Sequence, residues 1–196
     1  MPLTYKSVDL FGGAIVAEVP EGWEDVSQIR QVPDTQEVFL SSSGFSSIVF
    51  DILERVFPPP TDIEALKFHL SDIVESDASH TVLHKITSPP AITLSKMPST
   101  PVFSLLASAP TGEKMRGRPN EPDFVAIVLI LVRLENVGTD LVVSVNLPHI
   151  PGTYVKGEVD PDVEGKRGEL IEMGVEVAER VCGTLEVRDW GLFGEE

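Results

Sequence analysis

Apolar residues along this chain recur mostly with the period of β-strands. Residues 124–134 are apolar at every position except Arg133, and this run is well short of the roughly 20 residues that a membrane-spanning helix needs. It therefore predicts a central strand with both faces covered. Residues 139–147 alternate instead, with Asp140 and Ser144 among the polar side chains of one face, which predicts a less buried strand.

Shorter strand patterns fill much of the remaining chain. Residues 8–11 and 14–19 predict a hairpin around Gly12 and Gly13, because glycine supplies the positive φ angles of a two-residue turn. Further strands are expected at residues 37–40, 80–87 and 102–109. A short segment, Asp25 to Ile29, begins with a capping residue and predicts one helical turn.

Two segments have the spacing of amphipathic helices. The first follows three prolines, is expected to be capped at Thr61 or Asp62, and carries the apolar stripe Ile63, Leu66, Leu70 and Ile73, broadened by Phe68 and Val74. The second spans roughly residues 163–185, with Gly174 as a weak point. Because the helices do not alternate regularly with strands, the order predicts an α+β fold with a mostly antiparallel sheet of about six or seven strands and helices on both faces.

Length and charge narrow the class of protein. The 196 residues fit one domain, and 31 acidic against 15 basic side chains give a net charge of −16. Such a surface repels phosphate, so nucleic acid and anionic membranes are disfavoured as partners. The one cysteine, Cys182, lies in an apolar periodic segment and is expected to be buried, and the first residues lack a signal-peptide pattern. We therefore expect a nuclear or cytosolic protein.

Residues that could carry catalysis or bind a metal are sparse. His80 and His84 share a predicted strand, where side chains four apart are roughly 13 Å apart, so they do not form a metal pair. His69 is expected to be partly buried or on the surface, and His149 to be exposed in a loop. The sequence shows no phosphate loop and no recognisable set of Ser, His and Asp. We expect no cofactor, no metal and no enzymatic chemistry.

The segment Val32 to Phe39 carries the most informative polar pattern. Pro33 disfavours helix before it, and a strand is expected to begin at Glu37, so Asp34 and Glu37 are predicted to be two carboxylates on a stiff, exposed turn. A protein partner with a basic surface is the functional interpretation, and a solvated turn is the structural alternative.

Several blocks of the sequence, in order, resemble one family. They are Leu10-Phe11-Gly12-Gly13-Ala14-Ile15, Pro33-Asp34-Thr35-Gln36-Glu37-Val38-Phe39, Ile48-Val49-Phe50-Asp51-Ile52-Leu53-Glu54, Leu131-Val132-Arg133-Leu134 and Asp189-Trp190-Gly191-Leu192-Phe193-Gly194. The chain resembles the Ran guanine nucleotide release factor family, small nuclear transport proteins that bind the GTPase Ran and promote loss of its nucleotide. The resemblance favours a strand over residues 48–56, whose spacing also fits a helix, and implies a three-layer α/β/α sandwich similar to the extrinsic subunits of photosystem II.

The resemblance also implies a function and a site. Residues 1–196 would form one Ran-binding domain, monomeric, present in nucleus and cytoplasm, and acting by binding. The acids of the motif, Asp34 and Glu37, would contact Ran, with Asp25, Arg30 and Gln36 as neighbours. Two other classes stay open: a structural adaptor that uses the same fold to hold a different protein, and an enzyme, which would need a pocket with convergent polar groups.

Overall fold

A seven-stranded antiparallel sheet forms the centre of the molecule in the computed structural model, which describes residues 3–27, 32–57, 61–88, 92–112 and 116–194. Its strand order is β3-β4-β5-β9-β8-β7-β6, and every neighbouring pair is antiparallel. The strands are β3 (Trp23–Asp25), β4 (Gln36–Ser41), β5 (Ser47–Glu54), β6 (Val82–Thr87), β7 (Val102–Ala109), β8 (Phe124–Leu134) and β9 (Thr139–His149).

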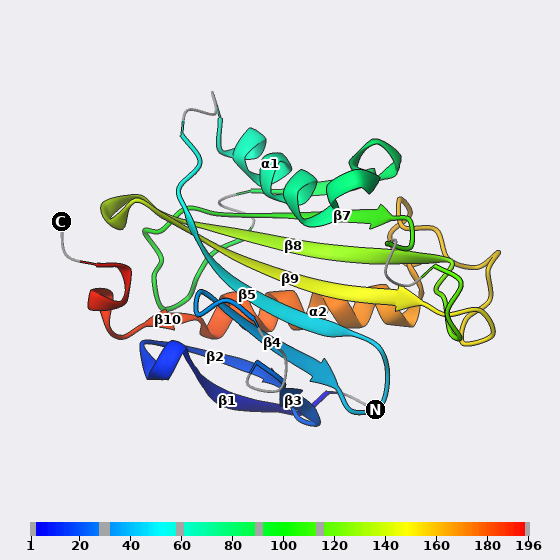
Figure 1. Ribbon diagram of the computed structural model, residues 1–196, viewed down its shortest axis with the longest axis horizontal. Helices are drawn as coiled ribbons and strands as arrows, with labels where there is room; N and C mark the ends of the chain where they lie inside the picture. The colour runs from blue at the N-terminus through cyan, green and yellow to red at the C-terminus, as the bar shows by residue number, and fades with distance from the viewer. Residues whose placement is uncertain (1–2, 28–31, 58–60, 89–91, 113–115, 195–196) are drawn as a thin grey trace.

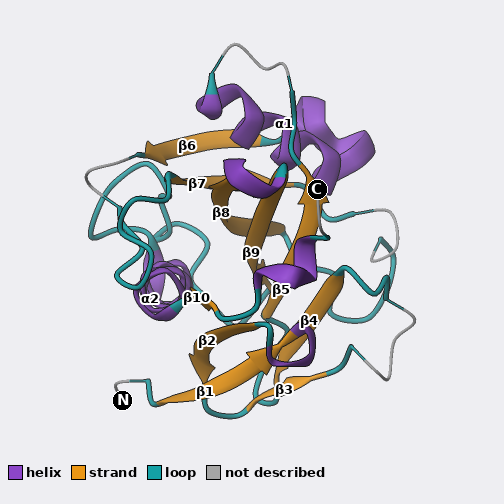
Figure 2. Ribbon diagram, turned by 90° about the vertical axis from the view of Figure 1, so that its left-hand side faces the viewer, coloured by secondary structure: helices purple, strands orange, loops and turns teal. Residues whose placement is uncertain are grey.

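Two helices and a smaller sheet cover the two faces of this sheet (Figure 1). Helix α1 (Asp62–Val74) lies on one face. On the other face lie α2 (Gly168–Thr184) and a three-stranded sheet of β1 (Tyr5–Leu10), β2 (Ile15–Pro20) and β10 (Glu186–Val187). Figure 2 shows this arrangement end-on to α2, with α1 and α2 on opposite sides of the strands. The predicted antiparallel sheet with helices on both faces is therefore confirmed, whereas the separate small sheet was not predicted.

Each face of the large sheet has its own hydrophobic core. Leu66 and Leu70 of α1 pack on Leu105, Leu129 and Val142. The larger core lies between the sheet, α2 and the small sheet, and its fully buried members include Leu10, Ile15, Phe50, Ile130, Val143, Ile171 and Val177. Because β8 contributes alternate residues to both cores, its continuous apolar run is explained by burial on both faces.

Strand β9 corrects the expectation of a half-exposed position. It lies between β5 and β8, and Asp140 and Ser144 on its polar face are 0% and 3% exposed. The strand also extends to His149, which is buried rather than exposed in a loop, because its ring stacks on Phe124 with centroids 4.1 Å apart. The alternation of polar and apolar residues did not reveal this burial. Helix α1 covers the polar face and supplies a partner for Asp140, which the pattern within β9 cannot show.

Several element boundaries also differ from the sequence prediction. The loop of the first hairpin contains four residues between Leu10 and Ile15, and Phe11, Gly12 and Gly13 all have positive φ. Asp25 ends strand β3 instead of beginning a helical turn, although residues 28–31 lie outside the described ones. Helix α2 begins at Gly168, five residues later than expected, because the backbone has positive φ at Gly165 (+81°) and at Gly168 (+78°) and cannot continue a helix through these positions.

Helix α1 begins where its sequence predicts. The Thr61 hydroxyl accepts a hydrogen bond from the Glu64 backbone N–H, which caps the helix, and it donates one to the Glu64 carboxylate. Phe68 differs from the expectation, because it faces solvent and is 56% exposed. No helix within the described ranges is long and apolar enough to cross a membrane.

Gly174 is a close-packing position rather than a weak point. A Cβ atom there would collide with Cδ1 of the fully buried Leu147. We expect Gly174→Ala to lower the free energy of unfolding by about 1–3 kcal/mol through overpacking. Gly183 lies on the same helix, and no atom lies within 4 Å of the position of its Cβ. Gly183→Ala should therefore raise the free energy of unfolding by up to about 1 kcal/mol. Urea unfolding of both variants tests this, and equal effects would contradict it.

Candidate partner-binding site

The Pro33–Gln36 turn presents Asp34 to solvent. The Gln36 backbone N–H donates to the Pro33 carbonyl at 2.9 Å and closes the turn, and the Ile52 N–H donates to the Thr35 carbonyl at 2.8 Å and holds the turn against β5. Asp34 lies between these anchors and is exposed. Its predicted place on a stiff turn is therefore correct.

Glu37 has a different environment from the one expected. It is the second residue of β4 and is partly buried, so it does not share the exposed turn with Asp34. Its Oε1 accepts a hydrogen bond of 2.6 Å from the Phe11 backbone N–H, in the loop between β1 and β2. This contact joins the small sheet to the large one. Replacing Glu37 with a residue that cannot accept the bond would therefore disturb structure as well as charge.

Asp25 lies on the same face of the sheet as Glu37. Asp25 pairs with Phe39 across the β3–β4 ladder, and residues two apart on a strand share a face. The Asp25 carboxylate accepts hydrogen bonds from the N–H and hydroxyl of Ser27, and the Ser27 hydroxyl accepts one from the Val38 N–H. We call Asp25, Asp34 and Glu37 the acidic edge. Arg30, the fourth charged candidate, lies outside the described residues.

The environment of Glu37 in the acidic edge shifts the pKa of its carboxyl. Burial raises the pKa of Glu37 above its ordinary value, the hydrogen bond from Phe11 opposes this, and the charge of Asp25 adds to it. Within the described part of the chain, no Lys or Arg nitrogen lies within 4 Å of any of the three carboxylates. Among the residues that the structure describes, no basic side chain neutralises this edge, which favours a partner with positive charge.

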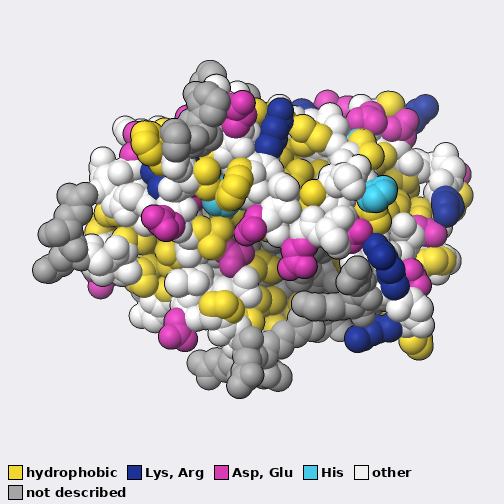
Figure 3. Space-filling view, turned by 45° about the horizontal axis from the view of Figure 1, so that its top comes forward, with side chains coloured by type: hydrophobic (Ala, Val, Ile, Leu, Met, Phe, Trp, Pro, Cys, Tyr) yellow, Lys and Arg dark blue, Asp and Glu magenta, His cyan; other side chains and the backbone are white. Residues whose placement is uncertain are grey.

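Gln36 points to the opposite face from Glu37. Its Nε2 donates to Asp51 Oδ1 at 2.6 Å, and Asp51 pairs with Val142, which belongs to the core under α1. Burial raises the pKa of Asp51, and the hydrogen bond from Gln36 partly offsets this. Figure 3 shows that acidic side chains lie among hydrophobic ones on this side of the molecule. The motif thus contributes to two faces of the sheet, and Gln36 is not a direct neighbour of the acidic edge.

A buried ionic network anchors α1 to the sheet, and sequence reasoning missed it. Asp140 Oδ2 lies 2.8 Å from His69 Nε2, and Asp140 Oδ1 lies 2.8 Å from Arg133 Nε. The contact with Arg133 has the distance of an ion pair without the angle of a hydrogen bond, so its attraction is Coulombic. Arg133 Nη1 also lies 3.2 Å from Asp62 at the start of α1. His69 is therefore a buried structural residue, and Arg133 has its expected covered position.

A Ser, His and Asp set is present in space, although the sequence did not reveal it. His84 Nδ1 lies 2.9 Å from Asp162 Oδ1, and His84 Nε2 lies 2.8 Å from the Ser108 hydroxyl. Ser108 is paired with Val82 on one side and Ala126 on the other, so the surrounding backbone N–H groups belong to the β-ladders and do not form an oxyanion hole. The set holds the loop at Asp162 against the sheet edge. The described residues also contain no group of three or more His, Cys, Asp or Glu side chains placed to hold a metal ion.

The raised pKa of Glu37 predicts a pH-dependent effect on stability. A carboxyl whose pKa is higher in the folded than in the unfolded state loses its proton less readily in the folded state. It therefore lowers the free energy of unfolding as pH rises from its unfolded pKa to its folded pKa. Below the ordinary pKa of 4.5 this effect is absent. We expect Glu37→Gln, which keeps an acceptor for Phe11, to be more stable than the parent near neutral pH and equally stable below pH 4.5. Urea unfolding across pH measures this, and a stability difference independent of pH would contradict it.

Comparison with known proteins identifies relatives over nearly the whole chain. A family model described as Ran-interacting Mog1 protein matches residues 8–148. The nuclear import protein mog1 of Schizosaccharomyces pombe is 30% identical over 190 residues, which are 95% of this chain and 99% of that protein. The Ran guanine nucleotide release factor of Danio rerio is 26% identical and covers 94% of this chain and 98% of its own. The crystal structure of the Saccharomyces cerevisiae Ran-binding protein Mog1p matches with a TM-score of 0.73 at 26% identity, over 98% of this chain and 100% of that one.

Proposed function

The chain belongs to the Mog1 family, described as Ran-interacting, and on this premise we propose that it binds the GTPase Ran and promotes release of its guanine nucleotide. Residues 1–196 would act as a single Ran-binding domain, a monomer that works in nucleus and cytoplasm by binding and without chemistry of its own. The observation that supports the proposal is the acidic edge, where Asp25 acts on Glu37 through its charge, Asp34 is exposed on the adjoining turn, and no described basic side chain pairs with any of them.

What an exchange factor must do to a GTPase explains why carboxylates suit its binding surface. A GTPase of the Ras type holds its nucleotide through a phosphate loop, a lysine and Mg²⁺, so an exchange factor must favour a conformation in which these contacts are weaker. A carboxylate near them can pair with the partner's basic side chains or compete with phosphate for positive charge. By linkage, a protein that weakens nucleotide binding is itself bound more weakly when nucleotide is present.

Release of a fluorescent guanine nucleotide from Ran tests the proposal. We expect the purified protein to accelerate release, and the acceleration to fall as salt increases, because charge attraction is screened over about 8 Å at physiological ionic strength. Release at the intrinsic rate at every salt concentration, with the protein in large excess and bound to Ran, would leave only a passive Ran-binding role. If no binding to Ran occurs either, the adaptor role with another protein partner becomes the better account.

A further inference from the structure

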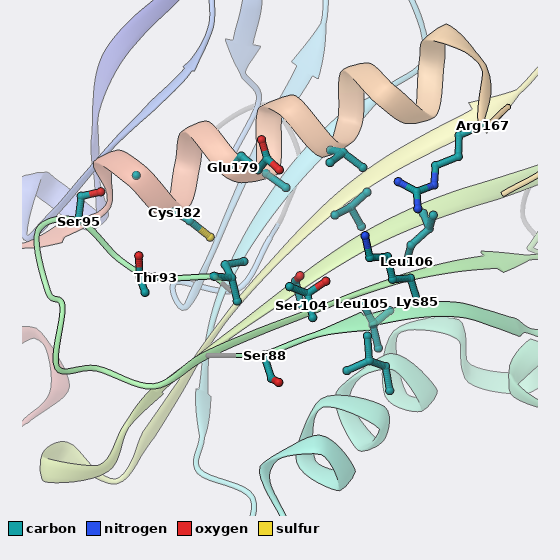
Figure 4. A pocket seen from close by; sticks show the side chains of 17 residues that line it. Lys85, Ser88, Thr93, Ser95, Ser104, Leu105, Leu106, Arg167, Glu179 and Cys182 are labelled. Carbon is teal, nitrogen blue, oxygen red and sulfur yellow. The ribbon is translucent and has the colours of Figure 1, made fainter. Parts of the chain in front are cut away.

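A cavity of about 720 Å³ lies between α2 and the β6–β7 edge of the large sheet. Figure 4 shows α2 along one wall and side chains of the sheet along the opposite one. Strand β6 forms one edge of the large sheet, and β3 forms the opposite edge. The acidic edge lies at β3 and its neighbour β4. The cavity is therefore a separate feature from the proposed Ran-binding surface.

Arg167, directly before α2, is the unusual residue of this cavity. It is only 6% exposed, and its Nε donates to the Pro161 carbonyl at 3.3 Å. Among the described residues, no carboxylate oxygen lies within 4 Å of its guanidinium nitrogens. Because the Arg167 side chain is largely covered, an anion that pairs with its guanidinium would gain a charge-assisted hydrogen bond in a partly desolvated site. Figure 4 shows the guanidinium pointing from the start of α2 into the cavity.

Lys85 adds a second positive charge at the same end. It extends from β6 into the cavity, and it has no carboxylate within 4 Å among the described residues. In a chain with 31 acidic and 15 basic side chains, two basic groups directed at one cavity are a local reversal of the overall charge. The N-terminus of α2, next to Arg167, adds a favourable dipole for an anion.

Most of the remaining lining is apolar or carries hydroxyl groups, and Glu179 is its acidic residue. Leu106, Val128 and Ala178 supply apolar surface, and Thr93 and Ser104 supply hydroxyls. Glu179 lies twelve residues along α2 from Arg167, which is about 18 Å at 1.5 Å per residue. The cavity is therefore positive at one end and negative at the other, so a ligand with a second anionic group would be repelled.

We propose that this cavity binds an organic anion with one carboxylate or phosphate head and an apolar body. Arg167 and Lys85 hold the head at the start of α2, and the body lies between α2 and strands β7 and β8. The proposal is independent of Ran binding, because none of the residues that it uses belongs to the acidic edge.

Binding of 8-anilinonaphthalene-1-sulfonate, a fluorescent organic anion with an aromatic body, tests this site. We expect Arg167→Gln to weaken its binding about tenfold or more, because a hydrogen-bonded ionic contact is lost. Lys166→Gln removes the same charge from the neighbouring exposed residue and should bind the probe like the parent. Octanoate or octyl phosphate should displace the probe, whereas octanol should not, and the stronger competitor identifies the preferred head group.

A steric variant tests the cavity without changing charge. Val175 lines the cavity, is partly exposed, and lies eight residues from Arg167 along α2, or about 12 Å, so Val175→Trp narrows the space next to the anion head. It should weaken probe binding about tenfold or more. If Arg167→Gln does not fold, Lys85→Gln on the exposed surface of β6 must weaken binding instead. Parent-like affinity in these variants, or displacement by octanol as effective as by octanoate, would overturn the proposal.

Discussion

Asp140→Ala is expected to lower the free energy of unfolding by about 3–5 kcal/mol, the range found when one partner of a buried ion pair is removed. Asp140 is 0% exposed and lies between His69 and Arg133, each at 2.8 Å. Its carboxylate also accepts a hydrogen bond from the Val56 N–H. Alanine would leave the guanidinium of Arg133 buried without this partner and would release α1 from β9.

Urea unfolding followed by circular dichroism measures this loss. Asp62→Ala is the matched control, because Asp62 contacts the same guanidinium at 3.2 Å but has a side chain that is 41% exposed. An exposed partner of this kind contributes about 1 kcal/mol or less. Equal losses in the two variants, or a loss below about 1 kcal/mol for Asp140→Ala, would show that the network does not stabilise the packing of α1.

Elements with strong local signals could be predicted from the sequence. The continuous apolar run of β8 predicted burial on both faces, and the Thr61 cap predicted the start of α1, because both depend on residues close together in the chain. The strands β3 and β10 contain three and two residues. They carry too few positions to show a period, so pairing with β4 and β2 defines them.

Polar residues with distant partners could not be predicted in the same way. Asp140 alternates like a surface residue, yet His69, 71 residues away in the chain, fills the space above it. His149 lacks a local signal for burial, and Phe124 provides its stacking partner across the β8–β9 ladder. In both cases tertiary packing decides burial, and alternation reports only which face a side chain occupies.

The candidate site also combines features that local sequence could predict with features that depend on tertiary packing. The motif and the exposure of Asp34 follow from the proline turn, which is local. The hydrogen bond between Glu37 and Phe11 depends on how the small sheet packs against the large one, which no local pattern encodes. The opposite directions of Gln36 and Glu37 follow from strand alternation once β4 is known to begin at Gln36 instead of Glu37.

The double variant Asp34→Ala, Glu37→Gln is expected to weaken Ran binding by about 2 kcal/mol or more, roughly 30-fold in Kd, which is typical when charged contacts at a partly buried interface are lost. Asp34 supplies an exposed carboxylate and Glu37 a partly buried one on adjoining positions. Glutamine at 37 keeps an oxygen that can accept from the Phe11 N–H, so the change removes charge while the two sheets stay joined.

Calorimetric titration against Ran, at low and physiological salt, measures the effect, and circular dichroism checks the fold. Glu164→Ala removes one charge from an exposed position in the loop before α2, away from the acidic edge, and should bind Ran like the parent. The loss in the double variant should shrink as salt rises, because the contacts at the edge are partly screened. Unchanged affinity in the folded double variant would exclude Asp34 and Glu37 from the Ran contact and would direct the search to the opposite face, at Gln36 and Asp51.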